Sequence, residues 1–179
     1  MPRCESGFSA SSPIADFCKH EVMAEFYQAL PERKDTIMTQ SFTATKAVTI
    51  NATPDRIWQA LTTPEEVKMY MFGAEVVSDW VKGGPVVYRG IWDGKPFEDK
   101  GVVLDVDEPL LLRTSYYSPL SGKPDTPDNY AVVTYAVSRD GKGSKLTVTQ
   151  TNIPDEAGLA QSESNWGMTL TAIKRLIED

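Results

Sequence analysis

The apolar residues between Asp155 and Glu178 recur at helical spacing and predict one long amphipathic helix. One face of this helix carries Leu159, Trp166, Leu170, Ile173 and Ile177. A helix of this kind is not stable alone in water, so its apolar face needs another element to cover it. Because a run of strand patterns comes before it, we expect a sheet to receive this face.

Residues 41–151 contain runs rich in β-branched and aromatic residues, separated by turn residues, which predict seven strands. The expected strands are 41–50, 74–81, 86–92, 97–105, 110–117, 130–138 and 145–151. Asp93-Gly94 and segment 140–143 are typical of hairpin turns, so the sheet should be antiparallel. Segment 118–129 carries three prolines and one glycine and predicts a loop long enough to cap part of the fold.

Two short helices are predicted directly after the first strand. Thr53-Pro54 and Thr63-Pro64 each place a capping hydroxyl before a proline, which suits a first helical turn. The first helix has an apolar face made of Ile57, Trp58 and Leu61, and the second runs to about residue 70.

Residues 1–40 are expected to form an N-terminal extension, and residues 41–179 the main domain. An amphipathic helix is predicted over about residues 13–30, followed by a charged linker. We interpret the extension as a packing or dimer-forming appendage. The alternative is that Met38 is the true start and that the residues before it are not native.

Composition and charge narrow the functional classes. The chain is 41% hydrophobic and 24% charged, as ordinary globular proteins are, and its net charge is −7. This charge and the absence of a Lys/Arg cluster argue against nucleic-acid binding. No run reaches the roughly 18 apolar residues of a membrane span, and the start lacks a secretory signal pattern, so a cytoplasmic location is expected.

The positions of histidine and cysteine limit the chemistry further. His20, Cys4 and Cys18 are the only ones in the chain, and all precede residue 40. The main domain therefore has neither the catalytic triads nor the zinc and haem sites that depend on these residues. We expect no metal and no cofactor, and any reaction would have to use the carboxyl, hydroxyl, Lys or Arg groups.

Charged residues near the fifth strand permit two further interpretations. The acidic segment 105–108 resembles a metal cluster, but a turn follows it, which favours a solvated strand end. Arg113, with Thr114 and Ser115, has the residue types to bind an anionic head group. The preferred interpretation is that Arg113 is an exposed partner of Asp105 or Asp107.

Three segments resemble the domain family named after activators of the Hsp90 ATPase. The resemblance in segment 47–71 is carried by Ala52, Ile57, Trp58, Ala60, Thr62, Pro64 and Glu65. Segment 100–117 is similar to the next family motif through Gly101, Val103, Val106, Pro109 and Leu112. Segment 165–179 is similar to the family's ending through Trp166, Leu170 and Ile173.

This resemblance implies an α+β helix-grip fold, in which a curved antiparallel sheet of about seven strands surrounds a long C-terminal helix. Two short helices follow the first strand. The wider SRPBCC superfamily includes lipid-transfer START domains, birch-pollen allergens and polyketide cyclases. Fold does not set function, so the resemblance leaves the ligand and the activity open.

Aromatic residues are expected around the cavity of such a fold, where they would line an apolar site. The ligand-binding candidates are Trp58, Tyr70, Phe72, Trp80, Tyr88, Trp92, Tyr116 and Trp166, together with Leu170 and Glu163. Plain core packing is the alternative for each aromatic residue. Alternation places Tyr88 and Trp92 on one strand face and Arg89 on the other, and their bulk favours an inward position for the two aromatic residues.

Glu163 is the candidate catalytic residue. It lies three residues before Trp166, on the expected buried stripe of the last helix. A carboxylate facing a cavity has a raised pKa, which suits general acid work or the binding of a cation. The alternative is that the start of the helix frays near Gly158 and that Glu163 reaches solvent.

Three functions remain after these arguments. The favoured one is a binding protein for a small apolar or aromatic molecule, without turnover. The second is an enzyme of the polyketide cyclase or dehydratase type. The third is an interaction protein that contacts Hsp90 or another partner, and homodimerisation also stays open.

Overall fold

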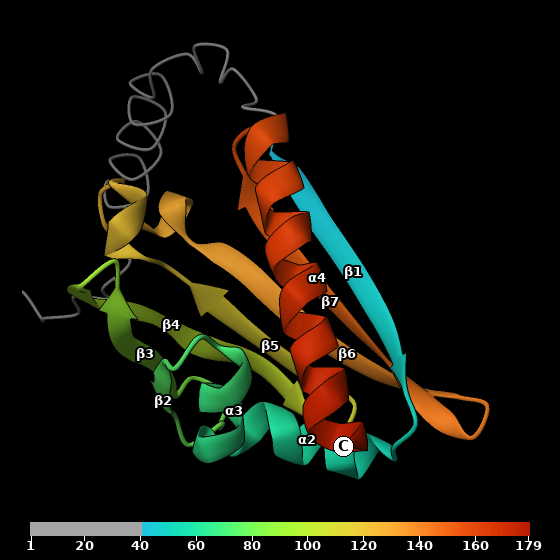
Figure 1. Ribbon diagram of the computed structural model, residues 1–179. Helices are drawn as coiled ribbons and strands as arrows, with labels where there is room; N and C mark the ends of the chain where they lie inside the picture. Colours follow the sequence, from blue (N-terminus) through green and yellow to red (C-terminus); the bar gives the residue numbers. More distant parts are fainter. Residues whose placement is uncertain (1–40) are drawn as a thin grey trace, which may run out of the picture. The chain divides into compact units, whose positions relative to one another are not determined.

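The computed structural model describes residues 41–179, which form an antiparallel sheet, three α-helices and two short 3₁₀ turns (Figure 1). The elements are β1 (Phe42–Ile50), α2 (Pro54–Thr62), α3 (Pro64–Tyr70), β2 (Glu75–Val77), β3 (Pro85–Trp92), β4 (Lys95–Asp107), β5 (Leu111–Tyr116), η1 (Pro119–Ser121), η2 (Pro127–Asn129), β6 (Ala131–Asp140), β7 (Gly143–Ile153) and α4 (Glu156–Glu178). The predicted seven strands, two short helices and long final helix are confirmed, and with them the α+β helix-grip architecture.

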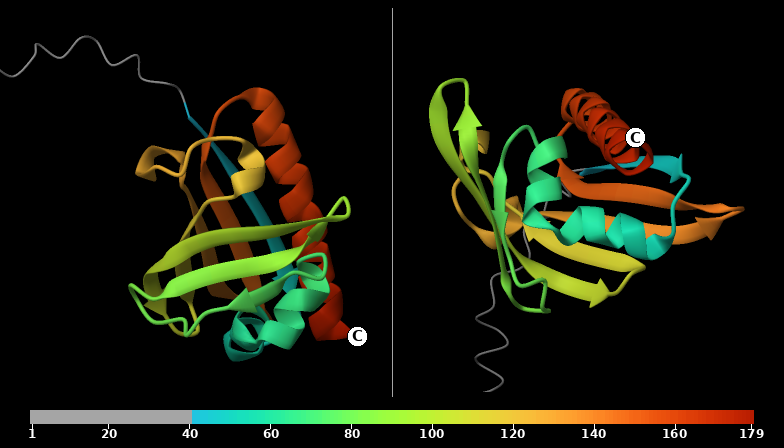
Figure 2. Two further views of the ribbon diagram at one scale, coloured as in Figure 1. Left: turned by 90° about the vertical axis from the view of Figure 1, so that its left-hand side faces the viewer. Right: turned by 60° about the horizontal axis from the view of Figure 1, so that its bottom comes forward.

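All seven strands belong to one sheet with the order β1-β7-β6-β5-β4-β3-β2. Every neighbouring pair is antiparallel, as the hairpin turns predicted. The sheet curves around α4, which lies across its concave side (Figures 1 and 2). Helices α2 and α3 lie at one end of the sheet, and the loop with η1 and η2 lies at the other.

Helix α4 begins at a capped end and buries the predicted face. The Asp155 side chain accepts a hydrogen bond from the Gly158 N–H at 2.7 Å, which satisfies one of the free amides of the first turn. Leu170 and Ile173 are almost fully buried against the sheet. Thr169 is buried beside them, although a pattern of apolar residues alone would not have placed it on this face.

The apolar core lies between α4, α2 and the concave face of the sheet. Its fully buried side chains include Ile50 on β1, Ile57 on α2, Leu146 on β7 and Ile173 on α4. These four residues come from both ends of the domain sequence, so the core forms only when the first strand meets the last strand and helix.

The prediction of a strand over residues 74–81 is wrong in its second half, because β2 ends at Val77. The Ser78 hydroxyl accepts a hydrogen bond from the Trp80 N–H, and the Asp79 carboxylate accepts one from the Val81 N–H. Trp80 has a φ of +55°, which a strand cannot accommodate. Side-chain capping therefore turns the chain where the residue types alone favoured extension.

Residues 1–40 lie outside the described residues. The extension, its predicted helix near residues 13–30, and His20 and Cys18 therefore stay predictions. Within residues 41–179, no helix is long and apolar enough to cross a membrane. The cytoplasmic location also stays a prediction.

Candidate functional site

A cavity of about 430 Å³ lies between the concave face of the sheet and α4. Its walls come from the α3–β2 connection, from strands β3 to β7, from the loop after β5 and from the middle of α4. The lining is mostly apolar and holds seven aromatic residues: Phe72, Tyr88, Trp92, Phe97, Tyr116, Tyr135 and Trp166. Its size and character are those of a small-molecule site.

Asp99 is the one ionisable carboxylate among the residues that line this cavity. This residue is only 7% exposed, although it lies on a strand between the exposed residue Glu98 and Lys100. One carboxylate oxygen, Oδ2, accepts a hydrogen bond of 2.7 Å from the Tyr116 hydroxyl. The other, Oδ1, is buried and has no hydrogen-bond partner among the described residues.

Three tyrosine hydroxyls of the cavity lining remain protonated over the physiological range. Burial raises the pKa of Tyr88 to about 12, with a further contribution from the negative charge of Asp99. Burial and the hydrogen bond to Asp99 raise the pKa of Tyr116, and burial raises the pKa of Tyr135. The Tyr88 and Tyr135 hydroxyls can therefore donate to a ligand, whereas the Tyr116 hydroxyl already donates to Asp99.

The α4 side of the cavity is fixed by Trp166. Its indole N–H donates a hydrogen bond of 2.8 Å to Gln150 Oε1 on β7. Its ring meets Tyr135 edge to face, with centroids 5.9 Å apart. These two contacts join helix and sheet across the cavity and set the orientation of the aromatic wall.

Five predicted binding residues line the cavity: Phe72, Tyr88, Trp92, Tyr116 and Trp166. The inward position predicted for Tyr88 and Trp92 is confirmed, and Arg89 between them points away and pairs with Glu98 at 2.7 Å. The structure thus brings together half of the predicted set and shows which strand face points inward.

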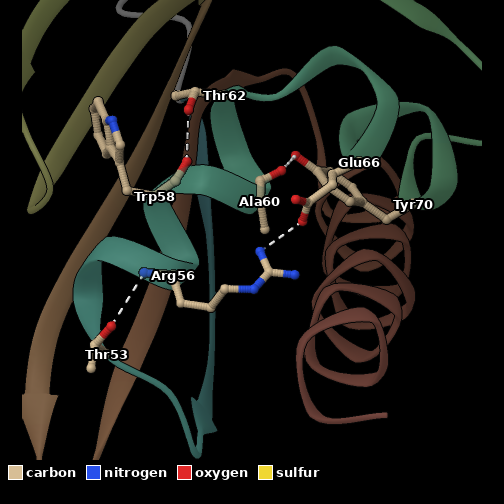
Figure 3. Close-up of polar contacts among 7 residues, drawn as sticks. All are labelled: Thr53, Arg56, Trp58, Ala60, Thr62, Glu66 and Tyr70. Atoms are coloured by element: carbon tan, nitrogen blue, oxygen red, sulfur yellow. Dashed lines mark hydrogen bonds and ion pairs between the residues drawn. The ribbon is translucent and has the colours of Figure 1, made fainter.

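Four other predicted residues do not line the cavity, because they pack in the core beside it. The hydroxyl of Tyr70 donates to the Ala60 carbonyl at 3.1 Å, which ties α3 to α2 (Figure 3). Trp58 and Leu170 are buried among core side chains. The Trp80 indole donates to the Thr62 carbonyl at 2.8 Å. For these positions the packing interpretation holds.

The prediction that Glu163 faces the cavity is wrong. Its carboxylate lies 3.3 Å from Lys46 Nζ on β1, and both side chains are 40% exposed. On α4, Ser162, Trp166 and Thr169 face the cavity, and the neighbouring position 163 is turned towards β1. No observation supports a proton-transfer role for Glu163.

Replacing Glu163 with glutamine is expected to change the free energy of unfolding by less than about 1 kcal/mol, because exposed ion pairs contribute little. Binding of any ligand in the cavity should be unchanged. Urea unfolding and ligand titration of the variant beside the wild type test this. Loss of ligand binding in the variant would show that Glu163 contributes to the binding site.

The candidate site contains residues that sequence reasoning missed, above all Asp99 and Tyr135. A signal for Asp99 was present, because alternation along β4 places it on the same face as Phe97. The charged run 98–100 hides this signal, because such runs are usually solvated. The same signal exists for Tyr135. On β6, the buried residues Val133 and Tyr135 alternate with half-buried residues.

The charged residues at the fifth strand lie outside the cavity. Asp105 lies 3.2 Å from Lys82 Nζ, so Lys82 is its observed partner. Arg113 lies opposite Asp105 in the sheet, but among the described residues no ion pair joins it to Asp105 or Asp107. Arg113 is exposed, whereas Thr114 beside it points into the cavity. The three residues proposed for an anionic head group therefore do not face a common site.

A second depression lies on the outer side of α4, next to Met69, Met168 and Leu176. It is open to solvent, and no unpartnered buried polar atom lies in it. The cavity under α4, which holds the buried Asp99 carboxylate, is therefore the candidate site.

The family model described as "Activator of Hsp90 ATPase homolog 1-like protein" matches residues 51–178. No curated protein sequence matches the chain. Among solved structures, ChR145 from Cytophaga hutchinsonii is similar with 43% identity and a TM-score of 0.69, over 76% of this chain and 94% of that one.

Two further structures share the fold at low identity. CalU16 from Micromonospora echinospora has 20% identity and a TM-score of 0.59, with 78% of this chain and 85% of that chain covered. The Aha1 dimer from Colwellia psychrerythraea has 16% identity and a TM-score of 0.61, over 76% of this chain and 96% of that one.

Proposed function

The chain belongs to the family of activator of Hsp90 ATPase homolog 1-like proteins, and we propose that it binds a small, mostly apolar or aromatic molecule in the cavity under α4. The observation that carries this proposal is the lining, in which seven aromatic residues surround about 430 Å³. A cavity of this kind in an antiparallel sheet gives a ligand a large apolar contact and a few polar groups that orient it.

The aromatic residues that border the cavity differ in their surroundings from those that pack in the core. Trp58, Tyr70 and Leu170 meet other side chains within the core, whereas Tyr88, Trp92 and Trp166 border the cavity. Trp92 is 59% exposed and Phe72 is 65% exposed, and their rings form an edge-to-face pair with centroids 6.4 Å apart. Exposed aromatic rings beside a cavity provide an apolar route for a ligand that enters from water.

A variant that fills the cavity tests the proposal. Ser162 on α4 borders the cavity and is half-buried, so a tryptophan at this position should occupy part of the space. We expect the Ser162→Trp variant to bind N-phenyl-1-naphthylamine, a probe whose emission rises in apolar sites, at least about tenfold more weakly than the wild type.

Ser164→Trp is the matched control for this experiment. Ser164 lies on the same helix but is exposed and borders the outer depression, so the variant should bind the probe as the wild type does. Equal binding by Ser162→Trp and the wild type would show that the probe does not use the cavity. Native mass spectrometry of the purified protein adds an independent readout, because a retained ligand gives extra mass that is lost on denaturation.

An enzyme is the second candidate, and the observation in its favour is Asp99. A buried carboxylate oxygen without a partner, next to tyrosine hydroxyls, has the groups needed to accept and return a proton. Asp99 now replaces Glu163 as the residue on which a cyclase or dehydratase activity would depend. Hsp90 binding and homodimerisation stay predictions, and titration calorimetry with an Hsp90 middle domain would test the first.

A further inference from the structure

The charge of Asp99 has no counter-ion in the cavity. Its Oδ2 accepts from the neutral Tyr116 hydroxyl, and its Oδ1 is buried without a partner among the described residues. Burying a carboxylate is costly unless it is hydrogen-bonded and paired with a positive charge. The Tyr116 hydroxyl supplies one hydrogen bond to Asp99, but it supplies no positive charge.

The neighbouring basic side chains are engaged elsewhere. Lys100, the next residue on β4, forms an ion pair with Asp125 and lies over the Tyr117 ring, 5.9 Å from its centroid. Arg89, on the adjacent strand, pairs with Glu98 on the outer face. Among the described residues, no Lys, Arg or His lines the cavity, so the chain itself brings no positive charge to Asp99.

The aromatic wall adds a second preference for positive charge. The faces of tyrosine and tryptophan rings attract cations, and this attraction grows when the cation is removed from water. Tyr88, Tyr116, Tyr135 and Trp166 line the same cavity as Asp99. A set of aromatic rings around one unpaired carboxylate has the composition of a site for an organic ammonium group.

We propose that the cavity selects an organic cation, with an apolar or aromatic body and a protonated amine that binds the Asp99 carboxylate. This inference rests on the proposed binding function and adds the chemical class of the ligand. A metal ion fits the same cavity poorly, because residues 41–179 contain no group of three potential ligand side chains and Asp99 stands alone.

Three naphthalene compounds with different head groups test the proposal, each measured by its displacement of N-phenyl-1-naphthylamine from the full chain. 2-Naphthylmethylamine carries a positive charge, 2-naphthalenemethanol carries a neutral donor, and 2-ethylnaphthalene carries neither. Because hydrogen bonds to charged groups are stronger than neutral ones, we expect the amine to bind at least about tenfold more tightly than the ethyl compound. The alcohol should lie between them.

The Asp99→Asn variant tests whether Asp99 is the cause of the preference for the amine. Asparagine has the shape of aspartate without its charge, so the amine should lose its advantage while the affinity for 2-ethylnaphthalene is kept. Glu98→Gln is the matched control, because it removes one negative charge from the neighbouring position on the exposed face. The preference should persist in this variant and at 0.5 M salt, since only exposed charges are strongly screened.

The results separate the two proposals. Equal binding of amine and ethyl compound by the wild type, or an amine preference that survives Asp99→Asn, would overturn the cation proposal and leave the binding function standing. Failure of the reporter to bind, together with no heat of binding for any of the three compounds in titration calorimetry, would overturn both. The comparison of the three compounds on the wild type needs no variant, so it decides the question even if Asp99→Asn does not fold.

Discussion

Replacing Gly101 with alanine is expected to destabilise the protein by about 3 kcal/mol or more. Gly101 lies in β4, and a Cβ at this position would overlap the carbonyl oxygen of Ser115 on β5. Beside this contact, the Val102 N–H donates a hydrogen bond of 2.9 Å to the Ser115 hydroxyl, which joins the two strands at the same point. Backbone atoms cannot move aside as a flexible side chain can, so the strands must separate.

Gly167→Ala is the matched control for this substitution. Gly167 lies inside α4, and an added Cβ would meet no atom within 4 Å. Since alanine favours a helix interior over glycine, this variant should be more stable than the wild type by about 0.5–1 kcal/mol. Urea unfolding measures both changes. A Gly101→Ala protein with the stability of the wild type would show that β4 and β5 are not this close.

Raising the pH from 10 to 12 is expected to remove much of the protein's stability. Burial is the main cause that raises the pKa of Tyr70, Tyr88, Tyr116 and Tyr135 above the ordinary value of about 10. A raised pKa stabilises the folded state while the hydroxyl is protonated in both states. This contribution is lost as the unfolded chain ionises, from about pH 10 up to the folded-state pKa.

Tyr88 gives a magnitude for this loss. Its pKa of about 12 lies roughly two units above the unfolded value, and one unit corresponds to about 1.4 kcal/mol, so Tyr88 alone contributes on the order of 3 kcal/mol. The midpoint of urea unfolding, followed by circular dichroism between pH 9 and pH 12, should fall steeply. The Tyr88→Phe variant should lose less stability over this range than the wild type. A constant urea midpoint up to pH 12 would contradict the prediction.

Much of the fold could be predicted from the sequence because local patterns and turn chemistry agree. Asp93-Gly94 turns the chain between β3 and β4, and both residues adopt the positive φ values that such a turn requires. Alternation in β3 places Tyr88 and Trp92 on one face, and their bulk identified that face as the inner one. In these segments local and tertiary preferences point the same way.

Where the prediction failed, tertiary contacts decided the structure. The segment after Val77 leaves the sheet, and there the Trp80 indole donates a hydrogen bond to the Thr62 carbonyl. The spacing of these two residues in the sequence does not predict that they lie close together. Glu163 and Trp166 are close on a helical wheel, yet only Trp166 borders the cavity. The apolar face of a helix is several residues wide, and contacts with neighbouring strands determine which of these residues border the cavity.

The key residue of the candidate site was hidden for a different reason. Asp99 lies within Phe-Glu-Asp-Lys, where three consecutive charged residues usually indicate a solvated strand. The period of two places Asp99 inward with Phe97, but a buried and unpaired carboxylate contradicts the ordinary preference of its residue type. Such a contradiction between local preference and position is expected at functional sites.

The pairing of β1 with β7 has a consequence for synthesis on the ribosome. Phe42 pairs with Ile153 and Ile50 pairs with Ser144, so the first strand of the domain to be made finds its partner only after about a hundred further residues. Until then β1 exposes an unpaired edge that other chains can join. The domain therefore completes its sheet and core only late in translation, and a nascent chain halted before β7 is the form most in need of chaperone protection.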